Sequence, residues 1–277
     1  MARRKKTQMI IDTAIAVLTE YHPMTLRQVY YQLVSRQVIE NNRNSYQATS
    51  DALVDARRDG SIPWVWIEDR LRRPREVYMS TDPQRWAAYL EYSYKRNVWG
   101  TQPTLLEVWL EKDALSGAFD LIRNYGMTLN VGRGYDGWSS LHLAAERYRA
   151  ATDAGQDVTI LYFGDFDPSG EDMVRSLGAR LNDLSSEPLI VKVSLTRNDI
   201  ERYHLPPNLT KPSDTRAAKH IERYGDVSVE LDALPIDVLQ ARITAEIEAR
   251  LDMTALAAVR EQERQEREHI REVLQAV

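Results

Sequence analysis

The stretch Thr159-Ile-Leu-Tyr-Phe-Gly-Asp-Phe-Asp-Pro-Ser-Gly170 carries the strongest structural signal in the sequence. Its first half is a short apolar run typical of a buried strand, and its second half holds residues that favour turns and helix starts. A second stretch, Leu105 to Glu111, is likewise an apolar run that ends on a carboxylate. Because ligands of parallel sheets bind at the carboxyl ends of the strands, we expect the two acidic strand ends to converge there.

Strands and helices alternate on both sides of these stretches. We expect strands at 104–110, 128–131, 158–163 and 189–195, and helices at 114–125, 139–154 and 170–184. Such alternation predicts an α/β fold with a mostly parallel sheet that helices cover on both faces. The charged segment 237–277 predicts a helical C-terminal tail.

The candidate site residues at this sheet edge are Glu111, Asp165 and Asp167. Asp165 and Asp167 lie two positions apart, which places both carboxylates on one side of an extended segment. Carboxylates so close repel each other unless a cation lies between them, and oxygen-only ligands favour Mg²⁺ or Mn²⁺. The alternative for the segment 165–170 is turn and helix-cap chemistry without a metal. The chain has no cysteine, which excludes thiolate ligands, and its five histidines lack ligand spacing.

The N-terminal part reads as three helices, at 7–20, 26–36 and 45–58, followed by an extended segment at 62–67 with Trp64 and Trp66 in its core. This order favours a winged helix over a plain three-helix bundle. The predicted organisation is a winged-helix domain at 1–80, a connector at 81–103, the α/β domain at 104–235 and the helical tail at 236–277.

Charge is distributed unevenly along the chain. Residues 1–80 hold 13 lysines and arginines against 9 acidic residues, and the remainder holds 23 against 32. A basic module joined to an acidic body favours one part that binds DNA and another that holds cations, with chance variation as the alternative. The candidate DNA-binding residues are Arg43, Gln47, Arg57, Arg58, Arg72 and Arg73. No run of 18 apolar residues is present, so we expect no membrane partner and a cytoplasmic location.

The acidic motifs resemble a known family. Glu111 with its strand, and Gly164-Asp-Phe-Asp-Pro-Ser-Gly170, are similar to the Toprim domain of the topoisomerase VI A subunit and of the related meiotic double-strand-break proteins. The segments 132–136 and 229–233 resemble a glycine-rich segment and an acidic strand of the same branch. The resemblance implies that a winged helix of the catabolite-activator type precedes a Toprim domain at 104–235. It also implies that Glu111, Asp165 and Asp167 bind Mg²⁺.

The resemblance extends to a tyrosine motif in the second predicted helix. The run Thr25-Leu-Arg-Gln-Val-Tyr-Tyr31 matches an arginine followed by paired aromatic residues, which implies that Tyr31 is the nucleophile and that Arg27 acts beside it. In a helix Tyr30 shares an apolar face with Leu26 and Leu33, so we expect Tyr30 in the core and Tyr31 accessible. The alternative is that both tyrosines serve packing.

The expected function is Mg²⁺-dependent DNA strand cleavage in which Tyr31 forms a phosphotyrosyl link. Two alternatives stay open: a nuclease that uses a metal-activated water while Tyr31 is structural, and a DNA-binding adaptor without catalysis. Nucleotidyl transfer of the primase kind ranks last, because no zinc-binding segment is present. A homodimer would bring one chain's Tyr31 to the other's acids, and strand passage would need an ATPase partner subunit.

Overall fold

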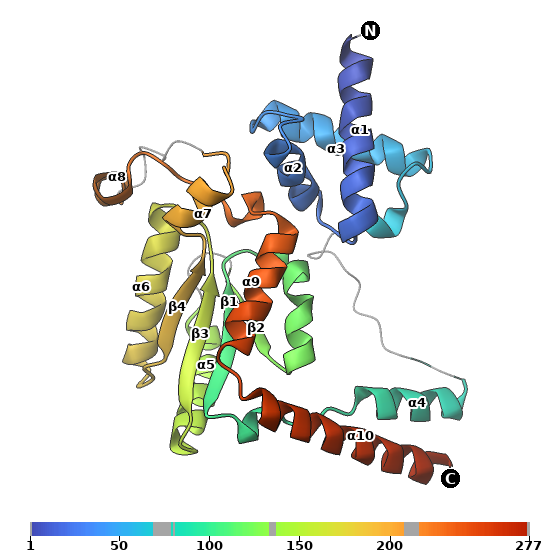
Figure 1. Ribbon diagram of the computed structural model, residues 1–277, viewed down its shortest axis with the longest axis vertical. Helices are drawn as coiled ribbons and strands as arrows, with labels where there is room; N and C mark the ends of the chain where they lie inside the picture. The colour runs from blue at the N-terminus through green and yellow to red at the C-terminus, as the bar shows by residue number, and fades with distance from the viewer. Residues whose placement is uncertain (1, 69–78, 80, 133–136, 208–215, 276–277) are drawn as a thin grey trace.

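The computed structural model describes residues 2–68, 79, 81–132, 137–207 and 216–275. A helical N-terminal part lies beside an α/β body, and a two-helix arm extends from the far end of that body (Figure 1). The body is built on a four-stranded sheet whose strands are all parallel, which confirms the predicted α/β class. No described helix is both long and apolar enough to cross a membrane.

The N-terminal part consists of α1 (Ala2–Tyr21), α2 (Leu26–Ser35) and α3 (Arg43–Arg58), with α1 packed against the other two. Helix α2 begins with a capping box. The Thr25 side chain accepts from the Gln28 N–H, and the Gln28 side chain accepts from the Thr25 N–H at 2.7 Å. This arrangement satisfies two backbone donors that a helix start leaves open. The helices share a core that includes Ala14, Val17, Leu18, Leu33, Leu53 and Ala56.

The segment 62–67 is not the extended segment that the sequence predicts. Trp64–Trp66 form a 3₁₀ turn, η1, in which the Trp66 N–H donates to the Pro63 carbonyl at 3.0 Å. An isolated β-bridge pairs Ile67 with Met24. Pro63 has the fixed φ that suits a turn start, and Trp64 is 59% exposed rather than in a core. The winged form of this part stays a prediction.

The sheet has the strand order β2-β1-β3-β4. Its strands are β1 (Thr104–Leu110), β2 (Thr128–Val131), β3 (Asp157–Phe163) and β4 (Leu189–Ser194). Leu110 lies opposite both Val131 and Phe163, so the carboxyl ends of the three neighbouring strands are level. The residues that follow β1 and β3 therefore meet at one edge.

Helices cover both faces of the sheet, as predicted. On one face α5 (Trp138–Asp153) and α6 (Pro168–Asp183) pack over Trp109, Ile160 and Tyr162. On the other face η4 (Asp113–Tyr125), which is a 3₁₀ helix, and α9 (Ile236–Glu248) pack over Val108, Leu110 and Phe163. Alternate side chains of a strand point to opposite faces, which explains why β1 and β3 are mostly apolar.

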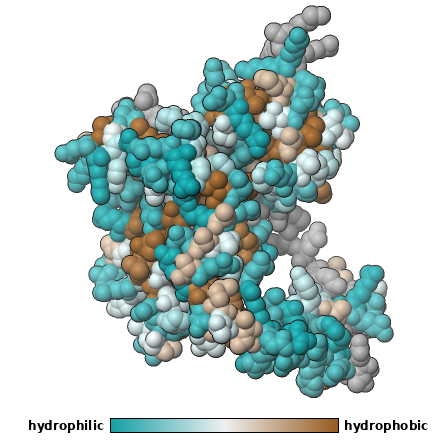
Figure 2. Space-filling model, in the orientation of Figure 1, coloured by the Kyte–Doolittle hydropathy of each residue, from teal (hydrophilic) through white to brown (hydrophobic). Residues whose placement is uncertain are grey.

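The predicted C-terminal tail is two helices with different roles. Helix α9 contributes Ile236, Leu239, Ile243 and Ile247 to the main core. Helix α10 (Met253–Gln275) instead pairs with α4 (Pro83–Ser93) through the polar contact Arg271–Glu91, and with the segment after α4 through Arg96–Glu266. The arm that they form is mostly hydrophilic on the face seen in Figure 2.

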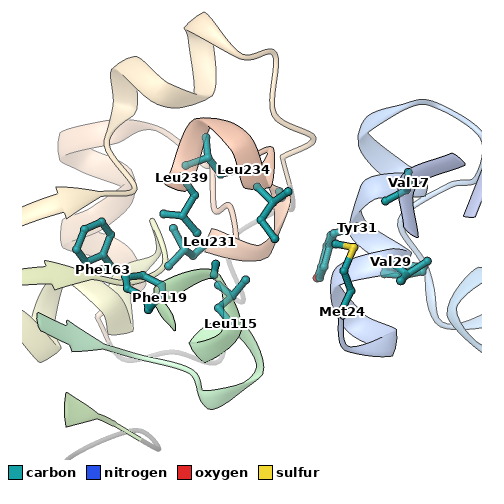
Figure 3. Packing of buried hydrophobic residues seen from close by; sticks show 14 of the residues in the cluster. Val17, Met24, Val29, Tyr31, Leu115, Phe119, Phe163, Leu231, Leu234 and Leu239 are labelled. Carbon is teal, nitrogen blue, oxygen red and sulfur yellow. The ribbon is translucent and has the colours of Figure 1, made fainter. Parts of the chain in front are cut away.

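Short elements complete the chain. They are η3 (Trp99–Thr101), α7 (Arg197–Arg202), α8 (Ala217–Tyr224) and η5 (Leu231–Ala233). The element η5 packs against α2, so the segment before α9 joins the N-terminal part to the body. The N-terminal helices and the sheet share one continuous apolar cluster, in which Tyr31 faces Leu231 and Leu234 (Figure 3).

Candidate functional site

The carboxyl ends of β1 and β3 bring Glu111 and Asp165 together. The Glu111 N–H donates to the Phe163 carbonyl at 2.9 Å and continues the ladder between the two strands. The Glu111 Oε2 atom then accepts the N–H of Asp165 at 2.8 Å. The two carboxylates thus lie at one sheet edge, and both are buried, at 8% and 3% exposure.

Gly164 makes this approach sterically feasible. A Cβ atom at position 164 would lie 2.6 Å from Glu111 Oε2 and 2.7 Å from the Tyr162 ring. Gly170 has a similar role, because a Cβ there would lie 2.4 Å from the Asp165 carbonyl oxygen. The two glycines of the quoted stretch therefore make room for Glu111 and for the backbone of Asp165.

Asp167 caps helix α6. Its Oδ1 atom accepts from the Gly170 N–H at 2.6 Å and from the Ser169 hydroxyl at 2.9 Å. Pro168, which has no N–H to satisfy, is the first residue of the helix. These contacts are the cap chemistry considered as the alternative for this segment. Among the described residues, no three acidic or histidine side chains are close enough to form a metal site.

Lys112 supplies a positive charge at the acidic edge. Its Nζ atom forms an ion pair with Asp165 and lies 3.3 Å from Oε2 of Glu230. The Leu231 N–H donates to the other Asp165 oxygen at 2.9 Å. Lys112 and Glu230 were not among the predicted site residues, although Lys112 adjoins Glu111 and Glu230-Leu-Asp232 repeats the spacing of Asp165-Phe-Asp167.

The pKa values at the edge are shifted. Burial raises the pKa of Glu111 to about 7, and the nearby Asp165 charge adds to that rise. Burial also raises the pKa of Asp165. Burial alone would lower the pKa of Lys112, but Asp165 and Glu230 outweigh it and raise that pKa, so Lys112 stays charged. Among the described residues, Glu111 forms no ion pair with any lysine, arginine or histidine.

Arg27 and Tyr31 reach this cluster from α2. Arg27 forms an ion pair with Glu230, and its Nε atom lies 3.5 Å from Asp232 Oδ2. Tyr31 and Glu230 line the same cavity, where burial and the Glu230 charge raise the pKa of Tyr31, and the Arg27 guanidinium lies 5.7 Å from the centre of the Tyr31 ring. A series of neighbouring side chains therefore runs from Tyr31 through Glu230 and Lys112 to Asp165.

The expectation that Tyr31 is accessible is wrong. Tyr31 is 6% exposed and Tyr30 is 3% exposed, so both belong to the core. The Tyr30 hydroxyl is held by Asn41 at 3.0 Å, whereas the Tyr31 ring faces Leu231 and Leu234 (Figure 3). A helical wheel of α2 cannot reveal a cover that comes from 200 residues further along the chain.

The predicted DNA-binding residues do not form one cluster. Arg43 is exposed at the start of α3 and lines a cavity of about 350 Å³ together with Tyr31, Tyr46 and Glu230. Gln47 bonds to Asp51 at 2.8 Å, and Arg57 lies 4.9 Å from the Trp64 ring, with the exposed Arg58 beside it. At 1.5 Å per residue, Arg43 and Arg57 are about 21 Å apart along the helix. Arg72 and Arg73 lie outside the described residues.

Comparisons with known proteins find no matching family model, no matching curated protein and no matching solved structure.

Proposed function

We propose that the protein binds DNA and cleaves a DNA strand by transesterification, with Tyr31 as the nucleophile. The observation that supports this most is that Tyr31 shares a cavity with Arg27 and Glu230, and that Glu230 is connected through Lys112 to Asp165. In the reaction the Tyr31 oxygen bonds to phosphorus, the bond from phosphorus to one sugar oxygen breaks, and that oxygen takes up a proton while the phenol loses one. The proposal agrees with the resemblance to the Toprim domain of the topoisomerase VI A subunit.

Each residue near Tyr31 has a distinct part in this proposal. Arg27 carries the positive charge that phosphate oxygens attract, and its planar donors suit them. Glu230 and Arg27 fix the position of the Tyr31 ring and hydroxyl. Burial raises the pKa of Tyr31, so its hydroxyl stays protonated until the reaction begins.

Glu111 and Asp165 would hold a Mg²⁺ or Mn²⁺ ion, with Asp167 beside them. These carboxylates offer the oxygen ligands that such an ion prefers, and Glu111 is buried without an ion-pair partner among the described residues. Lys112 already pairs with Asp165, and Asp167 caps α6, so an ion would compete with both arrangements. A bound Mg²⁺ would stabilise the negative charge that develops on the phosphate.

The test is a DNA cleavage assay in which the denatured products are compared with and without protease treatment. Purified protein is incubated with end-labelled supercoiled and linear DNA in Mg²⁺ or Mn²⁺. We expect cut DNA that carries protein and is released by protease, and we expect neither product with Tyr31→Phe or Asp165→Asn. A Tyr31→Phe variant that forms the protein-linked product as readily as the wild type would overturn the proposal.

One observation favours a hydrolytic nuclease as the second candidate. Tyr31 is 6% exposed and its pKa is raised by burial, which suits a structural tyrosine better than a free nucleophile. In that case a metal-activated water cuts the strand and leaves free ends. The same assay separates the two, because free ends would then persist in Tyr31→Phe and disappear in Asp165→Asn. Binding without any cleavage would instead favour a DNA-binding adaptor.

We propose that α3 makes the DNA contact, with Arg43, Arg57 and Arg58 as its cations. Arg43 lies beside the Tyr31 cavity, and Arg58 is exposed at the opposite end of the helix. A homodimer, an ATPase partner subunit and a cytoplasmic location complete the proposal.

A further inference from the structure

The Glu230 carboxylate lies beside two cations and a tyrosine hydroxyl, which come from two separate parts of the chain. Arg27 and Tyr31 approach it from α2, and Lys112 approaches from the segment after β1, with Nζ at 3.3 Å. Arg27 and Lys112 hold the pKa of Glu230 below its ordinary value even though burial works to raise it, so the carboxylate is charged. An anion therefore sits among two cations and a hydroxyl.

This donor set has the chemistry of a phosphate site. A guanidinium, an ammonium and a hydroxyl are the groups that hold the oxygens of a phosphodiester. One of them, the Tyr31 hydroxyl, is the proposed nucleophile, so an oxyanion in this place would have its phosphorus next to the attacking oxygen. A carboxylate and a phosphate share the charge and the oxygen acceptors that such donors bind.

Glu230 is also the member of the acidic cluster that is best placed to leave. Its side chain is 30% exposed, against 5% for Asp165 and 0% for Asp232. It lines the cavity of about 350 Å³ that Arg43 and Tyr46 border, so the carboxylate lies where that cavity meets the donors. A DNA strand that enters along Arg43 would meet Glu230 first.

Asp232 keeps Arg27 in place when Glu230 is absent. The Asp232 oxygens are buried and have no hydrogen-bond donor among the described residues, and Arg27 Nε, which has no acceptor among them either, lies 3.5 Å from one of these oxygens. The Nε side of Arg27 thus faces a fixed carboxylate, while its Nη2 side holds the exchangeable Glu230. Asp232 is therefore a positioning residue for Arg27.

We infer that Glu230 occupies the binding site of the scissile phosphodiester, whose ligands are Arg27, Lys112 and the Tyr31 hydroxyl, and that DNA must displace Glu230 to reach Tyr31. This inference rests on the proposed function and adds Lys112 and Glu230 to it. The chain carries its own competitor for the phosphate, so the closed arrangement is a resting form that DNA opens.

The test measures DNA binding in EDTA, where no cleavage takes place. Fluorescence polarisation of a labelled 20-base-pair duplex, at about 0.1 M salt, is followed for wild type and Glu230→Gln. The amide keeps the shape of the side chain but removes the charge that competes with phosphate. We expect Glu230→Gln to bind the duplex about tenfold more tightly, which is the order of one charge-assisted hydrogen bond.

Glu171→Gln is the matched control. Glu171 has a similar exposure, 33%, and pairs with a single lysine, Lys192, at the same sheet edge. We expect it to bind like the wild type within a factor of two or three. An equal gain in Glu171→Gln would show that lowering the negative charge anywhere on this edge suffices, and would overturn the inference.

The gain must also depend on Lys112. We expect Lys112→Met to cancel most of the gain in DNA binding from Glu230→Gln. The variant Lys112→Arg keeps the positive charge, so we expect it to retain the gain. Circular dichroism checks that each variant is folded. A gain that survives Lys112→Met in a folded variant would overturn the inference.

A second probe separates this inference from the proposed function. Inorganic phosphate should raise the melting temperature of Glu230→Gln more than that of the wild type or Glu171→Gln. That result without any DNA cleavage would keep the phosphate site and reject the cleavage proposal. Tyrosyl-linked cleavage together with equal phosphate and DNA binding by all variants would keep the proposed function and reject Glu230 as the competitor.

Discussion

Asp165 depends on partners from three separate segments. Lys112 pairs with its carboxylate, the Leu231 N–H donates to the same group, and Lys192 donates to its backbone carbonyl at 3.0 Å. A buried carboxylate is costly when it is unpaired, so each contact helps to keep Asp165 charged. The same contacts fix the position of the Asp165 carboxylate, and the proposed reaction at a phosphate requires a fixed position of this group.

Gly164→Ala is expected to damage the site directly. The new Cβ would overlap Glu111 Oε2 and the Tyr162 ring, so the free energy of unfolding should fall by about 1–3 kcal/mol and cleavage should fall by at least about tenfold. Gly100→Ala is the control, because nothing lies within 4 Å of its Cβ position. Chemical denaturation and the cleavage assay measure both effects. Equal behaviour of the two variants would mean that Glu111 has room to move.

Asp232 is expected to make stability depend on pH. Burial raises its pKa from 3.8 to about 6, so the folded protein holds a proton that the unfolded chain releases. The contribution of Asp232 to stability is therefore full below about pH 4 and declines as the pH rises towards 6, by roughly 1.4 kcal/mol per unit.

Denaturation of wild type and Asp232→Asn between pH 4 and pH 7 measures this contribution. We expect the wild type to lose on the order of 2–3 kcal/mol relative to Asp232→Asn across that window. A difference between the two proteins that stays constant with pH would show that Asp232 is already ionised at pH 4.

The start of α6 separates two roles of Asp167. Asparagine is as good a helix cap as aspartate, whereas alanine costs about 1 kcal/mol. We therefore expect Asp167→Asn to unfold like the wild type and Asp167→Ala to be less stable by that amount. If Asp167 also serves the metal, Asp167→Asn should lose cleavage while keeping its stability. Full cleavage by Asp167→Asn would leave Asp167 as a cap only.

Helix α3 is expected to show its DNA contact through charge reversal. Arg57→Glu with Arg58→Glu should weaken duplex binding, and the slope of log K against log salt should become shallower by about 1 for each lost phosphate contact. Arg250→Glu is a suitable control, because that residue lies on the body and pairs with Glu246 within the same region. Unchanged binding by the double variant would remove this end of α3 from the interface.

The strands and most helices could be predicted because their signals are local. The short, mostly apolar runs at 104–110 and 158–163 favour buried strands, and Thr25 with Gln28 marks a helix start within four residues. The sequence predicts an extended segment at 62–67, where a composition of Trp, Val and Ile favours strands, yet Pro63 starts a turn there. Strand propensities of single residues do not include the preference of the Pro63 backbone for a turn.

The site could be predicted only in part. Glu111 and Asp165 follow strands that pair with each other, so their meeting follows from topology. Glu230 and the cover over Tyr31 depend on packing between segments about 200 residues apart, and no local pattern encodes that distance. The sequence alone does not mark Lys112, because lysine is rarely buried unless it is paired, and its partners Asp165 and Glu230 lie far along the chain.

In the complete chain, the N-terminal helices close onto the acidic edge. The proposed homodimer was expected to bring Tyr31 of one chain to the acids of another, because the two lie in different predicted domains. The contacts of Arg27 and Tyr31 with Glu230 bring them together within one chain. We therefore expect both groups to act in the same chain.

Mixed subunits test this expectation. Tyr31→Phe and Asp165→Asn chains carrying different tags are expressed together and purified through both tags, and their cleavage is compared with each variant alone. We expect no restored cleavage, because no chain in the mixture has both groups. Tyrosyl-linked product from the mixed sample would show that the site forms between two chains.

The central claim is that Tyr31 becomes linked to DNA, and mass spectrometry of the trapped complex tests it most directly. The wild-type protein is incubated with DNA and Mg²⁺, denatured, and digested with nuclease and protease. We expect a nucleotide attached through phosphate to the peptide that contains Tyr31, and no such peptide from Asp165→Asn. A nucleotide on a different residue, or cut DNA without any modified peptide, would contradict it.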